Sequence, residues 1–234
     1  MANFLRLLVG IALLPLCWAF CRSLVDGLVV AAGGSGSMFS VESCSLLAGM
    51  VVFAFCWMTI SHPVRAYVLG HELTHALWGL LFGARPSDVK VSESGGSVKL
   101  TKSNVVITLA PYFFPFYTFL VIVVALITYA FLRPLPFLPL WLFAIGFTWA
   151  FHVLFTLETL SQRQPDVKLY GRIFSWTVIL IINIALVLVW LASMTPLTFA
   201  GVWVSLSVRA QSAYLGVWGF CRTWTLWGIE KLRG

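Results

Sequence analysis

The chain has 234 residues, of which 60% are hydrophobic and 10% charged, whereas soluble domains average about 45–50% apolar and about 25% charged residues. This composition excludes an ordinary soluble domain and predicts an all-α polytopic integral membrane protein of about five to seven helices. The net charge is +7, but Lys and Arg are scattered without a basic run or an aromatic RNA-binding motif. We therefore expect no nucleic-acid partner, and the charge favours contact with the lipid bilayer.

Two apolar segments open the chain. Leu7 to Phe20 superficially resembles a signal peptide, but no small-residue cleavage site of the A-x-A kind follows it. We therefore expect an uncleaved first transmembrane helix that runs to about Val30. Ser45 to Ile60 is a second segment, slightly short for a bilayer crossing.

The apolar run from Ala66 to Ala84 contains His71-Glu72-Leu73-Thr74-His75, a HExxH motif in a predicted membrane helix. Positions i and i+4 share one helix face, roughly 6 Å apart, so both imidazoles can reach one metal ion. A bound Zn²⁺ lowers the pKa of its water from 15.7 to about 7, and Glu72 is placed to take the proton. A structural role is the alternative, but ionisable groups in a membrane are costly and usually functional.

The polar stretch after this helix is predicted to be a β-hairpin over residues 88–104. Its valines alternate with polar residues, and Gly95-Gly96 would form a two-residue turn that places Val91 opposite Leu100. An exposed edge of the hairpin would align an extended substrate by strand addition. A plain connecting hairpin is the alternative.

Further apolar segments long enough to cross a membrane follow: Val105 to Leu132, Leu140 to Leu160 and Ile173 to Ala192. Pro111 and Pro115 are expected to bend the first of them. A polar break over residues 161–172 separates the last two. The Trp-rich tail from Thr195 predicts an interfacial helix or a weakly apolar final crossing.

A catalytic zinc site usually has three protein ligands. The longer pattern HExxHxxGxxH is excluded, because Trp78 and Leu81 occupy the positions of its Gly and third His. The remaining candidates for the third ligand are Asp166, Glu158, His152 and His62. We favour Asp166, which follows a proline and is predicted on the same membrane side as the C-terminal end of the motif helix, with Glu158 as the alternative. His152 would aid the transition-state oxyanion or simply pack in the core.

Positive charges predict the orientation of the chain in the cell membrane. The hairpin and the Asp166 loop both carry Lys and Arg, and two spans lie between them, so both are expected on the cytoplasmic side.

From about residue 60 to 175 the chain resembles the site-2 protease family of intramembrane zinc metalloproteases. In that family a transmembrane HExxH is followed by a β-hairpin, a further span and an Asp, usually in an LDG motif. This chain lacks the LDG triplet and an upstream Asn-x-x-Pro. The resemblance implies that His71, His75 and Asp166 bind Zn²⁺, that Glu72 is the general base, and that the substrate is a membrane protein or peptide.

Three regions follow from these predictions: N-terminal transmembrane helices over 1–60, a metalloprotease-like core over 61–175, and a C-terminal transmembrane helix with an interfacial tail over 176–234. The alternative function is a non-catalytic, metal-binding membrane scaffold or transporter. A transporter would carry more ionisable residues in its spans than this chain does. The sequence leaves the substrate, the regulatory partner and the oligomeric state open.

Overall fold

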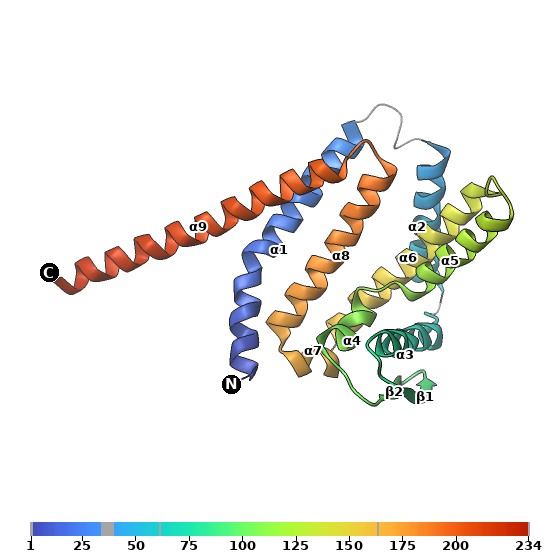
Figure 1. Ribbon diagram of the computed structural model, residues 1–234, viewed down its shortest axis with the longest axis horizontal. Helices are drawn as coiled ribbons and strands as arrows, with labels where there is room; N and C mark the ends of the chain where they lie inside the picture. The colour runs from blue at the N-terminus through green and yellow to red at the C-terminus, as the bar shows by residue number, and fades with distance from the viewer. Residues whose placement is uncertain (1, 34–39, 61, 163, 234) are drawn as a thin grey trace. The chain divides into compact units, whose positions relative to one another are not determined.

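A computed structural model describes residues 2–33, 40–60, 62–162 and 164–233 of the chain (Figure 1). The protein is mostly helical, at 81%, with a small two-stranded antiparallel hairpin, so the predicted fold class is confirmed at this level. Helices long and apolar enough to cross a membrane are α1 (Ala2–Gly33), α2 (Val41–Thr59), α6 (Leu138–Ser161) and α8 (Arg172–Met194). These four helices are consistent with a multi-pass membrane protein.

The described chain forms two compact units. One, Met1–Met38 with Tyr170–Gly234, contains α1, α8 and α9 (Phe199–Arg233). The other, Phe39–Leu169, contains α2 to α6, the hairpin and most of the short helix α7 (Pro165–Tyr170). The division into three sequence regions remains a prediction. In the structure, α1, the first helix of the chain, packs with α8 and α9, the last two.

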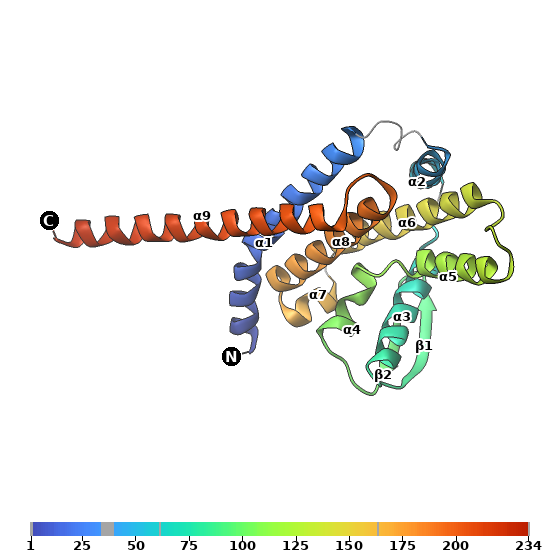
Figure 2. The ribbon, with the colours of Figure 1, turned by 45° about the horizontal axis from the view of Figure 1, so that its top comes forward.

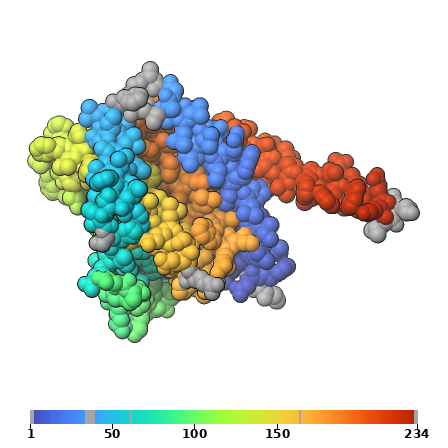
Figure 3. All heavy atoms as spheres, turned by 180° about the vertical axis from the view of Figure 1, so that it is seen from behind, coloured from blue at the N-terminus to red at the C-terminus, as the bar shows by residue number. Residues whose placement is uncertain are grey.

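In the second unit, α2 and α6 pack closely because glycines face the partner backbone. A Cβ on Gly49 would overlap the carbonyl oxygen of Phe143, and one on Gly146 would overlap that of Leu46. Small residues allow such close approach where apolar burial alone does not hold helices together. Figure 3 shows α2, in cyan, beside the yellow segment that includes α6.

The motif lies on α3 (Val64–Leu81), which is held to α2 and α6 by aromatic packing. The Tyr67 ring stacks on that of Phe155, with centroids 4.7 Å apart and planes 5° apart. Contrary to our expectation, α3 is not among the described helices apolar enough to cross a membrane by themselves. The cause is its composition, since Arg65 and the three ionisable motif residues lower its hydropathy.

The predicted segment Val105 to Leu132 is broken, as its prolines indicated. It forms α4 (Val105–Leu109), the 3-10 turn η1 (Ala110–Tyr112) and then α5 (Phe116–Phe131). The two parts are bent by 84° and would count as a fifth span if they cross together. Pro111 lies in the first turn of η1 and Pro115 directly precedes α5, where neither needs a backbone N–H inside a helix. The bend is therefore confirmed.

The hairpin consists of β1 (Pro86–Ser92) and β2 (Gly95–Leu100) and lies beside α3 (Figure 2). Its predicted turn and register were wrong. The turn is Glu93-Ser94, Val91 pairs with Gly96, and Leu100 pairs with Pro86. The reason is tertiary: a Cβ on Gly96 would lie 2.6 Å from Val68 Cγ1 and 2.7 Å from Glu72 Cγ, so this glycine is needed for close approach to α3.

In the first unit, α1 packs against α8 and α9. A bidentate ion pair ties α1 to α9, since Arg209 Nε and Nη2 donate to the two oxygens of Asp26, each at 3.0 Å. The predicted tail is one continuous helix that is not among the described candidate spans. Its second half, red in Figure 3, extends beyond α1 and exposes Trp218 and Trp224, as an interfacial helix would.

Candidate metal centre

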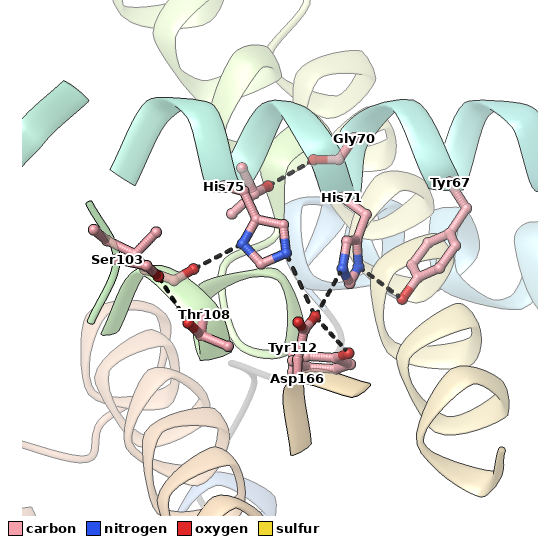
Figure 4. A network of polar contacts seen from close by, with 10 residues as sticks. Tyr67, Gly70, His71, His75, Ser103, Thr108, Tyr112 and Asp166 are labelled. Carbon is pink, nitrogen blue, oxygen red and sulfur yellow. Dashed lines mark hydrogen bonds and ion pairs between the residues drawn. The ribbon is translucent and has the colours of Figure 1, made fainter. Parts of the chain in front are cut away.

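Two histidines of α3 and one aspartate of α7 meet at a single point. His71 Nε2 and His75 Nε2 each lie 3.5 Å from the same carboxylate oxygen, Asp166 Oδ2 (Figure 4). One ligand atom from each of the three residues lies within 4.8 Å of the other two. The side chains are only 12%, 12% and 28% exposed. This group can hold a metal ion.

Local sequence explains why these side chains converge. One helical turn separates His71 from His75, which places both rings on one face with centroids 4.9 Å apart. Pro165 is the first residue of α7, a position where proline suits a helix start. The polar break predicted here therefore begins a short helix, and Asp166 lies in its first turn.

Outer contacts orient the three candidate ligands. His75 Nδ1 donates to the carbonyl of Ile107 at 2.8 Å, which leaves Nε2 as the nitrogen that faces Asp166. The Tyr112 hydroxyl donates to Asp166 Oδ2 at 3.1 Å. His71 Nδ1 lies 3.5 Å from the Tyr67 hydroxyl. Such outer partners fix ring orientation and ligand basicity in metal sites.

Sequence reasoning did not identify these outer residues. Tyr67 precedes His71 by four positions, so helical spacing alone would place it on the same face. Tyr112 and the Ile107 carbonyl reach the site because α4 and η1 fold back against α3. Asn104 caps α4 by accepting a hydrogen bond from the Ile107 backbone N–H at 2.9 Å. No pattern in the sequence indicates that Tyr112 and the Ile107 carbonyl will contact Asp166 and His75.

The neighbours of Asp166 stabilise the charged form of its carboxyl group. Burial by itself raises the pKa of this carboxyl group, but hydrogen bonds from His71 and His75 outweigh burial and hold the pKa well below its usual range. The group is thus a carboxylate at neutral pH. A carboxylate oxygen and two imidazole nitrogens form a donor set that suits zinc among the divalent metals.

Glu72 is buried, with 7% of its surface exposed. Its side chain lies under β2, where a Cβ on Gly96 would come within 2.9 Å of Oε1. The carboxylate therefore lies between the helix that carries the histidines and the hairpin. It is close to the metal group without being one of its three members.

The other candidate ligands lie elsewhere. His62 stacks on Trp57 with ring centroids 3.7 Å apart, and its Nδ1 lies 3.8 Å from Glu158 Oε2. Glu158, the alternative third ligand, is thus paired with His62 rather than grouped with the motif histidines. His152 is buried on α6 and lines a small cavity that His71 also lines.

Comparisons with protein-family models, with curated proteins and with solved structures find no match for this chain.

Proposed function

We propose that this protein is a multi-pass integral membrane protein of the cell membrane that hydrolyses peptide bonds of membrane-protein substrates with a bound zinc ion. One observation carries the proposal. Asp166 lies 3.5 Å from the Nε2 atoms of both histidines of a HExxH motif, although it comes 91 positions after His75 in the chain. The order of a HExxH motif, a β-hairpin, a further span and an Asp along the chain suggested the resemblance to the site-2 protease family.

Each residue has a role that follows from its position. His71, His75 and Asp166 would hold the zinc ion, with a coordination position left for water or substrate. When bound, zinc supplies Lewis-acid chemistry, polarising a peptide carbonyl and acidifying water. Glu72 would accept the proton of the attacking water and pass it to the departing amine. Its burial limits competing contact with bulk solvent.

The hairpin would align the substrate. Peptide bonds inside a helix are shielded by their own hydrogen bonds, so a transmembrane substrate must unwind before cleavage. The residues of β1 and β2 are mostly exposed, and an edge of this two-stranded sheet can pair with an extended segment. Such pairing would place the unwound chain next to Glu72.

The test compares wild-type protein with Glu72→Gln, and with Glu42→Gln as the matched control, since Glu42 is exposed on α2. Each protein is reconstituted in liposomes with zinc and a mixture of single-span membrane proteins. New N-termini are then identified by mass spectrometry. We expect wild type and Glu42→Gln to cleave the same sites, and Glu72→Gln to be slower by about 10²–10⁴-fold with its zinc retained.

Equal cleavage by Glu72→Gln and wild type would contradict the proposal. So would the absence of cleavage by zinc-loaded wild type, which would favour a metal-binding scaffold or transporter.

A further inference from the structure

A small cavity lies beside the metal centre. It is lined by α3, by the segment from Pro111 to Tyr117, and by α6. Its volume is about 20 Å³. By the same measure, a cavity that holds one water molecule needs roughly 10–15 Å³. The cavity therefore has room for a single small polar group, such as a water molecule or a carbonyl oxygen.

Most polar side chains of the cavity wall already have partners. Thr74 Oγ1 donates to the Gly70 carbonyl at 2.7 Å, and the Tyr117 hydroxyl donates to the Ala66 carbonyl at 2.6 Å. Tyr67 and His71 contact each other, as described above. The Thr74 and Tyr117 hydroxyls therefore have no donor hydrogen left for a carbonyl ligand.

His152, in contrast, has a polar atom of the cavity wall without a partner. Only 7% of its surface is exposed, and its Nε2 has no hydrogen-bond partner among the described residues. A buried polar atom without a partner carries a free-energy penalty, and such atoms are uncommon in native proteins. His152 lines the same cavity as His71, which belongs to the metal centre.

Packing holds His152 in this position. Its neighbours on α6, Phe151 and Phe155, contact aromatic rings of α3 and α5. The Phe155 ring stacks on Tyr67, and the Phe151 ring meets Tyr117 edge-on with centroids 5.4 Å apart. Rotation of α6 would break both contacts, so they hold the face of α6 that carries His152 beside the cavity.

We propose that His152 is a substrate-binding residue whose Nε2–H donates a hydrogen bond to the carbonyl oxygen of the peptide bond presented beside His71. This inference rests on the proposed peptidase function. A donor to that oxygen would stabilise the negative charge that develops there as water attacks, and a preorganised donor is effective because it needs no rearrangement. Because the amide group of glutamine also carries N–H donors, His152→Gln retains the contact in part.

The binding test uses cobalt-loaded protein and acetohydroxamic acid, a small probe with a carbonyl oxygen, titrated through the cobalt visible spectrum. His152→Leu and His152→Phe remove the N–H donor and replace the imidazole with apolar side chains of two different shapes. His152→Gln keeps an N–H donor. His62→Gln is the control, because His62 lies outside the cavity. We expect full metal content in every variant and a Kd raised about 5- to 10-fold for Leu and Phe. His152→Gln and the control should stay within about 3-fold of wild type.

The activity test uses a substrate that wild type cleaves in the liposome assay. Removal of the donor should lower kcat by about 10²-fold with a small change in KM, and His152→Gln should recover part of the loss. A purely structural role, or a permanently bound water, predicts no rescue by glutamine and no change in hydroxamate affinity.

The outcomes separate the two proposals. Unchanged hydroxamate affinity in the Leu and Phe variants would overturn the role of His152, whatever Glu72→Gln does. Affinity that depends on His152 together with cleavage that does not depend on Glu72 would overturn the peptidase and support a carbonyl-binding site beside the metal.

Discussion

At the scale of single residues, the candidate metal centre depends on one carboxylate supplied from a distant segment. The two histidines are placed by helical spacing, but Asp166 arrives through the fold and is held by the Tyr112 hydroxyl as well as by both imidazoles. Glu158 has the same carboxylate chemistry yet lies against His62. The two acids are therefore a matched pair for a test.

We expect Asp166→Ala to lose zinc and Glu158→Ala to keep it. Removal of one of three ligands should weaken metal binding by more than the roughly 10- to 100-fold that an outer-contact substitution costs. Zinc per chain is measured by elemental analysis of purified, detergent-solubilised protein, without chelators. Retention of zinc by Asp166→Ala, or its loss in Glu158→Ala, would show that the metal lies elsewhere.

At the scale of elements, strand β2 of the hairpin packs over the Glu72 side chain. Gly96 allows β2 to lie against α3 at the position of the Glu72 side chain. A methyl group there must displace the strand, the Val68 side chain or the Glu72 side chain, since its nearest contacts would lie at 2.6–2.9 Å. We therefore expect the position of β2 to affect the side chain of Glu72, the proposed general base.

Gly96→Ala is therefore expected to lower the cleavage rate while zinc content stays unchanged, with a loss of stability of about 1–3 kcal/mol from overpacking. The neighbouring Ser97→Ala, on an exposed side chain, serves as the control and should behave as wild type. Hydrogen exchange over residues 86–100 reports strand displacement. A Gly96→Ala protein with wild-type rate and exchange would rule out this coupling.

At the scale of the whole molecule, the candidate spans predict on which side of the membrane the hairpin and α7 lie. The hairpin and α7 are separated in the chain by α5 and α6, and two crossings would return the chain to its starting side. Lys and Arg in both regions favour the cytoplasmic side. The turn between α5 and α6, which contains Arg133, would then face the opposite side.

The test uses single cysteines in a background without the native ones, all five of which are free thiols in the structure. Ser94→Cys in the hairpin turn and Lys168→Cys in α7 should react with a membrane-impermeant maleimide only in inside-out vesicles. Arg133→Cys should react only in intact cells. Reaction of Ser94→Cys and Lys168→Cys from opposite sides would contradict the two-crossing arrangement and the shared metal site.

The sequence by itself determined the features that depend on local pattern. Apolar run length predicted the helices, proline position predicted the 84° bend, and the i, i+4 spacing placed His71 and His75 on one face. These follow from helical periodicity and from the missing N–H of proline, which act over a few residues.

Only the tertiary structure decided between Asp166 and Glu158 as the neighbour of the histidines, set the hairpin register through Gly96, and placed His152 beside the cavity with an unpartnered nitrogen. Each depends on contacts between segments far apart in the chain. A residue's type and its local spacing do not specify which distant side chain it will meet, because that is settled when helices and strands pack around one another.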